Sequence, residues 1–252
     1  MAAILECEKV TKVYGGLVAV RDVSFSVEQG QVYAIVGPNG AGKSTLFDTL
    51  SGLSAATSGV IHFAGRQIQQ LRGDQICKLG LARAFQTTVS FATQTALTNV
   101  LVGGVFGHAG STALGFAPAA VDRALDALET CDLLDKQDIE ASRLSAFELK
   151  RLMLATALAT RPTLLLLDEP VGGLNIRERE QLMELMRRIS AAGMSILMIE
   201  HVMKAVQALA DRMLVLHHGE KITEGSPSTV LRDERVRDVY LGSPAAKSAQ
   251  AE

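Results

Sequence analysis

A single stretch near the N-terminus, residues 31–45, restricts the possible folds of this chain more than any other. It reads QVYAIVGPNGAGKST, which is a β-rich run, a glycine-rich turn and the beginning of a helical pattern. The turn matches the motif G-x-x-x-x-G-K-[ST], and it has the strand before it and the helix after it that this motif requires. The stretch therefore predicts a strand–loop–helix unit within an α/β fold.

The residue types in this loop suit the binding of phosphate. Glycines let backbone N–H groups turn inward around phosphate oxygens, where a side chain would block the approach, and the following helix points its positive end at the same anion. Lys43 is expected to contact β- and γ-phosphates, and Ser44 to bind Mg²⁺. An ordinary glycine-rich turn is the alternative, and the order of the glycines argues against a dinucleotide site. The predicted nucleotide-binding residues of the loop are Gly37, Pro38, Asn39, Gly40, Ala41, Gly42, Lys43, Ser44 and Thr45.

A second feature, the run LLLLDE at residues 164–169, ends on two acidic residues and complements the phosphate loop. Its apolar run is typical of a strand buried on both faces. Asp168, at the end of that strand, is expected to bind Mg²⁺, and Glu169 to orient or polarise an attacking water as a catalytic residue. A strand that ends in Asp-Glu is common and means little alone. Together with a phosphate loop it favours the functional interpretation.

The remaining chain reads as an α/β core with a helical insertion between about residues 87 and 160. Strands are predicted at ILECEKV, VRDVSFSV, GVIHFAG, SILMIE and RMLVLHH, and a helix at VMKAVQALA. The run GGVFGHAGSTALG, residues 103–115, is predicted to be a loop that interrupts the helical insertion. Residues 1–242 are expected to form one domain, and residues 243–252 a disordered tail.

Composition limits the function classes. The 252 residues fit one large domain with a sizeable core, and a net charge of −2 gives no support for nucleic acid as the main partner. The three cysteines lie far apart, so neither a disulfide framework nor a metal site is indicated, and a reducing cytoplasmic setting fits best. No apolar run approaches the roughly 18 residues of a membrane helix, and Glu6 comes too early for a secretory signal.

With these motifs in order, residues from Ile4 to about Gly242 resemble the ATP-binding subunits of ABC transporters. The resemblance implies a P-loop NTPase core of the ABC ATPase type, with an antiparallel β subdomain and an inserted helical subdomain. It implies ATP and Mg²⁺ as ligands, with Lys43 and Glu169 in catalysis. It also implies four further roles: adenine stacking for Tyr14, Mg²⁺ and water sensing for Gln86, contact of the γ-phosphate for catalytic His201, and a dimer contact for Asn175.

The partners follow from the same resemblance. They are transmembrane permease subunits that touch the region of Gln86 and the helical subdomain, a second ABC ATPase subunit, and, indirectly, a solute-binding protein. The expected location is peripheral, on the cytoplasmic face of the inner membrane. VYGGLVAVRDVSFSVEQG, GLN, IEH and the ending VYLG resemble the branched-chain amino acid uptake group, which imports hydrophobic amino acids and related small solutes.

The stretch RLSAFELKR, residues 143–151, departs from the family pattern. Ser145 and Glu148 form a capping box at a helix start, and they also occupy the place of the family signature LSxGQ together with Ala146 and Phe147. In the family this signature faces the ATP bound by the partner subunit. Phe147 adds a bulky ring where glycine allows close approach, and Glu148 adds negative charge near an anion.

The altered signature predicts a heteromeric pair with one competent and one degenerate ATP site. Ile176 replaces a proline and Val202 an aspartate of the family pattern, and neither change removes a catalytic group. Two alternatives remain. One is a regulatory module that binds ATP and dimerises with little hydrolysis, which Phe147 favours. The other is a relative acting on DNA or the ribosome, whose coiled-coil insertions or tandem domains are missing from this chain.

Overall fold

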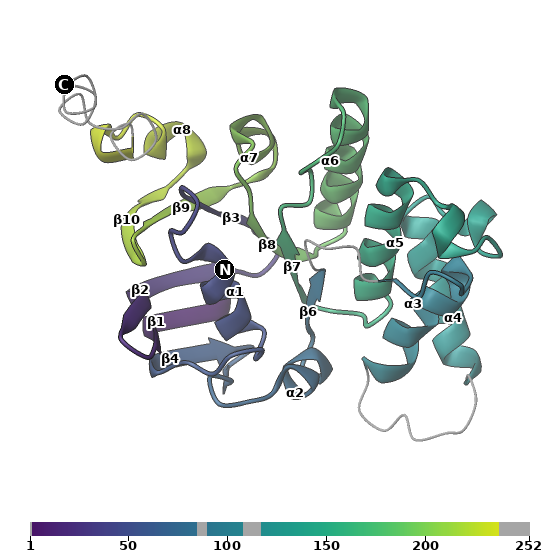
Figure 1. The fold of residues 1–252 in the computed structure, drawn as a ribbon, viewed down its shortest axis with the longest axis horizontal. Coiled ribbons are helices and arrows are strands. Elements are labelled where there is room, and N and C mark those ends of the chain that lie inside the picture. Colours follow the sequence, from purple (N-terminus) through teal and green to yellow (C-terminus); the bar gives the residue numbers. More distant parts are fainter. Residues whose placement is uncertain (1, 85–89, 108–116, 237–252) are drawn as a thin grey trace.

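The computed structural model describes residues 2–84, 90–107 and 117–236, and its largest element is a six-stranded sheet (Figure 1). Its order is β10-β9-β3-β8-β7-β6, parallel except for the antiparallel edge strand β10. The strands are β3 (Val32–Val36), β6 (Leu81–Ala84), β7 (Leu164–Asp168), β8 (Ser195–Ile199), β9 (Arg212–His217) and β10 (Glu220–Gly225). All residues of β3, β7 and β8 are buried, as their continuous apolar runs predict.

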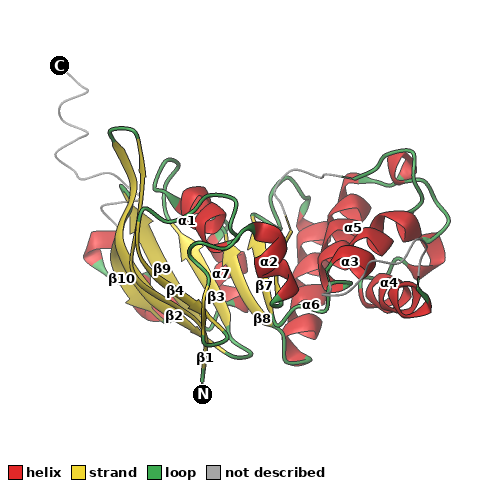
Figure 2. Ribbon diagram, turned by 90° about the horizontal axis from the view of Figure 1, so that it is seen from below, coloured by secondary structure: helices red, strands yellow, loops and turns green. Residues whose placement is uncertain are grey.

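A four-stranded antiparallel sheet forms a second layer, next to the first helix of the chain (Figure 2). It consists of β1 (Ala3–Tyr14), β2 (Leu17–Glu28), β4 (Ser58–Phe63) and β5 (Arg66–Gln67). Helix α1 (Lys43–Leu50) packs between the two sheets, because its buried Leu46, Phe47 and Leu50 share one apolar cluster with residues of both. The core thus fixes the start of α1 at the carboxyl end of β3.

Three of the helices form a separate group at one side of the larger sheet. Helices α3 (Ala96–Phe106), α4 (Pro118–Thr130) and α5 (Ala146–Leu158) pack on one another within the stretch predicted as a helical insertion (Figure 1). The short 3₁₀ turns η1 (Leu134–Lys136) and η2 (Ala141–Arg143) join α4 to α5. The other helices are α2 (Gly73–Lys78), α6 (Ile176–Ala191), α7 (Met203–Leu209) and α8 (Pro227–Val230).

These elements confirm the predicted fold class, a P-loop core with an antiparallel β subdomain and an inserted helical part. The predicted strands and the helix after residue 202 are all present, and α6 buries Leu182, Leu185, Met186 and Ile189 on one face. No described helix is long and apolar enough to cross a membrane. The predicted tail, residues 243–252, lies outside the described residues.

One sequence prediction was wrong. The glycine-rich run was expected to be a loop from residue 103, but Gly103–Phe106 form the last turn of α3. The reason is packing: a methyl group added at Gly103 would overlap the backbone carbonyl of Thr156 on α5, and one added at Gly104 would meet the carbonyl of Ala120 on α4. These glycines permit close helix contact instead of ending the helix. Residues 108–116 lie outside the described part of the chain.

Candidate nucleotide-binding site

The predicted phosphate loop lies between β3 and α1, and its glycines are required by geometry. Gly42 has φ 97° and directly precedes α1, and a Cβ atom there would overlap the carbonyl oxygen of Ala19. A Cβ atom on Gly37 would overlap the carbonyl oxygen of Leu216. The loop is further held by a hydrogen bond of 3.0 Å from the Gly219 N–H to the Ala41 carbonyl. The loop backbone is therefore enclosed on one side and open on the other.

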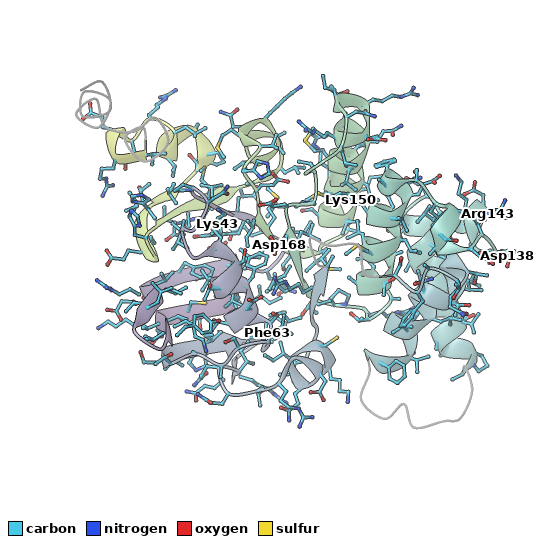
Figure 3. All side chains as sticks on the ribbon, in the orientation of Figure 1. Lys43, Phe63, Asp138, Arg143, Lys150 and Asp168 are labelled. Carbon is cyan, nitrogen blue, oxygen red and sulfur yellow. The ribbon has the colours of Figure 1, made fainter. Side chains whose placement is uncertain are left out.

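Lys43 holds its ammonium group over this loop. Its Nζ donates to the carbonyl oxygens of Gly37 at 2.7 Å and Pro38 at 2.9 Å, and the residue is buried. Burial lowers the pKa of Lys43, while the charges of Glu169 and Asp168 act to raise it. Figure 3 shows Lys43 and Asp168 in the central part of the molecule. Lys43 is the first residue of α1, and Asp168 is the last residue of β7.

An open cavity covers the loop. The residues that line it are Leu17, Val18, Ala19, Asn39, Gly40, Ala41, Gly42, Lys43, Ser44, Thr45, Glu169, His218 and Gly219. The cavity thus brings the predicted phosphate loop and the predicted catalytic glutamate to one place. It also includes His218, which sequence reasoning did not single out because it lies 173 or more residues from the loop, after β9.

Asp168 ends β7 and is paired with an arginine. The Arg83 guanidinium donates to Asp168 Oδ2 at 3.1 Å and to Asp48 Oδ1 at 2.7 Å, and the Arg83 and Asp168 side chains are almost fully buried. Burial raises the pKa of Asp168, and Arg83 opposes that rise. Asp168 supplies a carboxylate and Ser44 a hydroxyl, which are the hard oxygen donors that Mg²⁺ prefers. The donor set therefore fits the predicted metal.

Glu169 and His201 lie together although 32 positions separate them. The parallel pairing of β7 with β8 places Asp168 opposite Ile199. Glu169 and His201 therefore both lie just beyond the carboxyl ends of these two neighbouring strands. The Nδ1 atom of His201 lies 3.7 Å from Glu169 Oε1. Glu169 has φ 48°, a backbone conformation uncommon for a residue with a side chain, and its N–H donates to the Ile199 carbonyl at 2.9 Å.

Two of the predicted contact residues, Tyr14 and Asn175, stand at the end of one element and directly before the start of another. Tyr14, at the end of β1, is exposed and its hydroxyl donates to Ser54 Oγ at 3.2 Å. It does not line the cavity, although Leu17, Val18 and Ala19 from the adjoining hairpin do. Asn175 precedes α6, where its side chain and that of Glu178 cap each other's backbone N–H groups at 3.0 Å. This capping role was missed from the sequence. Gln86 lies outside the described residues.

The stretch predicted to be an altered signature is a helix start with local partners. Ser145 Oγ accepts the Glu148 N–H at 3.2 Å, and Glu148 accepts the Ser145 N–H at 2.8 Å, which confirms the capping box. The Phe147 ring is half-buried against the core, and the Arg151 guanidinium lies 4.7 Å from its centre. Ala146, which lies between Ser145 and Phe147 in the sequence, is exposed.

The charge of Glu148 is compensated within the chain. Its carboxylate forms an ion pair with Lys136 of η1. Burial acts to raise the pKa of Glu148, but Lys136 and the Ser145 N–H lower it to about 2. Sequence reasoning anticipated an unfavourable charge unless screened, and it missed Lys136 because that residue lies 12 positions away.

The fold is that of an ATP-binding cassette. A crystal structure of a nucleotide-free ATP-binding cassette from an ABC transporter superposes with a TM-score of 0.88 and 29% identity, covering 96% of this chain and all of that one. The ABC transporter family model matches residues 20–172, and the model for branched-chain amino acid ATP-binding cassette transporters matches residues 220–246.

Two relatives agree with these matches. The chain is 36% identical to the high-affinity branched-chain amino acid transport ATP-binding protein BraF of Pseudomonas aeruginosa, over 95% of this chain and 98% of the relative. It is also 36% identical to LivG of Salmonella typhimurium, over 91% of this chain and 94% of the relative. The chain therefore belongs to the ABC transporter family, in the branched-chain amino acid ATP-binding group, and it is an ATPase of that family.

Proposed function

We propose that this chain binds and hydrolyses ATP to energise an importer for branched-chain amino acids or related hydrophobic small solutes. The observation that carries the proposal is the 3.7 Å approach of His201 to Glu169 beside the phosphate-loop cavity. The solute class rests on the names of the relatives BraF and LivG. The same cluster argues against a regulatory module with little hydrolysis, because such a module needs no catalytic carboxylate at this point.

Each residue of the cluster has a defined role in the proposed reaction. The loop N–H groups and Lys43 bind the β- and γ-phosphates, and Tyr14 stacks on adenine. Ser44, Asp168 and Gln86 would hold Mg²⁺, which would supply positive charge to neutralise the phosphate oxygens. Glu169 orients a water and accepts its proton, while His201 contacts the γ-phosphate.

The chemical step is then a displacement at phosphorus. The water oxygen forms a bond to the γ-phosphorus as the bond to the β–γ bridging oxygen breaks, which releases ADP and phosphate. Glu169 is close to the cavity and its backbone is fixed by the bond to Ile199, so the water is held without reorganisation of the loop. Lys43 stabilises the charge that develops on the leaving phosphate.

We further propose that permease subunits dock at an apolar groove whose lining includes Arg83 and Ala84, three and two positions before Gln86 in the sequence. The groove is lined by parts of α2, α3 and α5 and by Arg83 and Ala84, which directly precede residues 85–89. Leu53, Phe91 and Phe106 are large apolar side chains that are exposed there. An exposed apolar patch of this kind marks a protein interface. Through the permease, the chain would act at the cytoplasmic face of the cell membrane, with a solute-binding protein on the opposite side.

The second ATPase subunit is proposed to be a different chain with an intact signature. Ser145, Ala146, Phe147 and Glu148 would face its ATP, and Asn175 would lie at the contact. Phe147 takes the place where glycine would allow the closest backbone approach. Two observations moderate the expected defect: the ring of Phe147 rests on its own subdomain, and Lys136 neutralises Glu148. The site facing Phe147 is therefore expected to be weakened and not abolished.

The test is Mg²⁺-ATP turnover of the chain alone across protein concentration, with Phe147→Gly beside the wild type. The expected result is a weak rate per subunit that rises with concentration and increases severalfold with glycine. Full turnover independent of concentration and unchanged by Phe147→Gly would rule out the asymmetric pair. The absence of turnover with an added ABC ATPase subunit that carries an intact LSxGQ signature would contradict the ATPase role of the site.

A further inference from the structure

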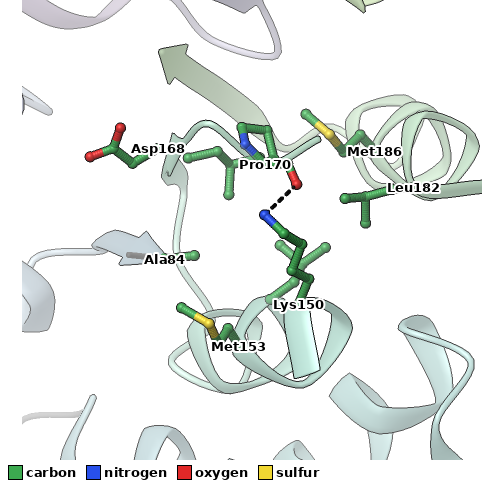
Figure 4. Close-up of a pocket in the computed structure, with 9 residues that line it drawn as sticks. Ala84, Lys150, Met153, Asp168, Pro170, Leu182 and Met186 are labelled. Carbon is green, nitrogen blue, oxygen red and sulfur yellow. Dashed lines mark hydrogen bonds between the residues drawn. The ribbon is translucent and has the colours of Figure 1, made fainter. Parts of the chain in front are cut away.

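The peptide unit that joins Pro170 to Val171 is held at both polar ends by charged side chains. Lys150 Nζ donates to the Pro170 carbonyl oxygen at 3.0 Å (Figure 4). Glu200 Oε1 accepts the Val171 N–H at 3.0 Å. A cation at the carbonyl and a carboxylate at the N–H favour the same orientation of this peptide, and such charge-assisted bonds are roughly twice as strong as neutral ones. The fixed peptide begins one residue after Glu169.

The other oxygen of Glu200 reaches the loop that carries His201. Glu200 Oε2 accepts the N–H groups of His201 and Val202, both at 3.0 Å. Glu200 therefore accepts three backbone N–H groups in all, the bonding pattern of an ionised carboxylate. One side chain thus joins the segment that follows β7 to the segment that follows β8.

Both charged groups are withdrawn from solvent, Glu200 fully and Lys150 in part. Glu200 is completely buried. The Lys150 side chain extends from α5 along a small cavity whose apolar lining includes Met153, Leu182 and Met186 (Figure 4). Burial lowers the pKa of Lys150, and the charges of Glu200 and Glu169 act to raise it. Buried charges are expensive unless they are paired and hydrogen-bonded, so the bonds at this peptide stabilise both groups.

Glu169 itself needs such support. Its φ of 48° is unfavourable for a residue with a side chain, and conformations of this kind persist only where the surroundings over-determine them. Lys150 Nζ lies 3.4 Å from the Glu169 carbonyl oxygen, in addition to its bond to Pro170. The Gly172 N–H donates to the same carbonyl at 3.1 Å.

We propose that Lys150 and Glu200 are positioning residues that hold the Glu169 segment and the His201 segment in the mutual arrangement needed for hydrolysis. Lys150 lies on the helix that begins at Ser145, so the pair also ties the altered signature to the catalytic carboxylate of the same subunit. The inference rests on the catalytic roles proposed for Glu169 and His201. It assigns the pair no contact with nucleotide.

The test compares Glu200→Gln, Lys150→Met and the double variant in the full chain. Glutamine keeps the shape of Glu200 but must turn an NH₂ group toward a backbone N–H, and methionine keeps the apolar stem of Lys150 without its charge. The matched controls are Glu184→Gln and Lys204→Met, which change exposed members of surface ion pairs. Three quantities are measured: kcat and KM for ATP, affinity for ATP without turnover, and hydrogen exchange at the amides of Val171, His201 and Val202.

We expect each single variant to lower kcat at least tenfold while KM and ATP affinity change less than twofold. The double variant should be no slower than the slower single variant, because residues that act as one unit are not additive. Amide exchange should accelerate at Val171 in both variants and at His201 and Val202 in Glu200→Gln. The controls should match the wild type in all three measurements.

Three results would overturn the proposal: an unchanged kcat in either single variant, kcat losses that multiply in the double variant, or a KM that rises by the same factor as kcat falls. Hydrogen exchange separates this inference from the proposed function. A wild-type chain without turnover would count against the proposed function, and accelerated exchange in both variants would still support the pair. Unchanged exchange would overturn the pair whatever the turnover.

Discussion

The guanidinium of Arg83 joins Asp168 at the end of β7 to Asp48 on α1, with donor–acceptor distances of 3.1 and 2.7 Å. This bridge connects strand β6 with the end of β7 and with α1, the helix that follows the phosphate loop. Arg83 therefore holds together two carboxylates that would otherwise repel each other.

Replacing Arg83 with methionine should destabilise the fold. The change leaves the buried Asp168 carboxylate without its arginine partner, and breaking a buried ion pair in this way costs about 3 kcal/mol. The exposed pair of Arg21 with Glu220 offers a matched control, since Arg21→Met should change the free energy of unfolding by no more than about 1 kcal/mol. Urea denaturation of both variants measures the difference. Equal losses in the two variants would show that the Arg83 bridge contributes no more than a surface pair.

Replacing Glu169 with glutamine should separate binding from chemistry. Glutamine keeps the size of the side chain but accepts no proton from water, so kcat should fall by a factor of about 10² or more. Affinity for ATP should stay within about twofold, because Glu169 is not proposed to bind the phosphates. Single-turnover hydrolysis and ATP titration measure the two quantities, and Glu184→Gln on the exposed side of α6 is the control. Comparable loss of affinity and kcat would mean that Glu169 serves binding instead of catalysis.

The local elements that carry the candidate site were predicted correctly where contiguous residues define them. The loop from Gly37 to Thr45 and the strand that ends at Asp168 each contain their own chemistry and their own flanking pattern, so a local motif is sufficient. The proximity of Glu169 and His201 depends instead on the pairing of β7 with β8. Their family roles suggested proximity, but only the strand register gives the contact its geometry.

The contacts that the sequence did not reveal come from residues distant along the chain. Four basic residues look like ordinary surface residues in the sequence, and each acquires its contact only when another element packs against it. They are Lys136, Arg151, Arg83 and Lys150. Gly103 shows the opposite error, because a glycine that signals a loop by local propensity can also serve close helix packing. Propensity is a weak guide where tertiary contacts decide.

Substitution of Gly103 with alanine tests that packing argument. Alanine favours a helix by about 1 kcal/mol over glycine, but the added methyl group would overlap the Thr156 carbonyl of α5. Overpacking of this kind costs about 1–3 kcal/mol, so the net effect should be destabilising. Gly16→Ala is the control, since no atom lies within 4 Å of a Cβ atom there. Thermal unfolding measures both, and stabilisation by Gly103→Ala would contradict the close contact of α3 with α5.

The ion pair of Glu148 with Lys136 should make stability depend on pH in a defined direction. Burial acts to raise the pKa of Glu148, but Lys136 and the Ser145 N–H bring it down to about 2, below its ordinary value of 4.5. A pKa that is lowered by folding adds stability above pH 4.5, and this stability is lost as the pH falls through about 2.

In the variant Lys136→Met the pKa of Glu148 should move back toward 4.5, and this stabilisation should largely disappear. The wild type should therefore exceed the variant in free energy of unfolding at pH 7, and the difference should shrink steadily between pH 4.5 and pH 2. Urea denaturation at a series of pH values measures it, with Lys204→Met as a control for loss of a surface cation. A difference that stays constant down to pH 2 would mean that Lys136 stabilises the fold through its stem and not through the charge of Glu148.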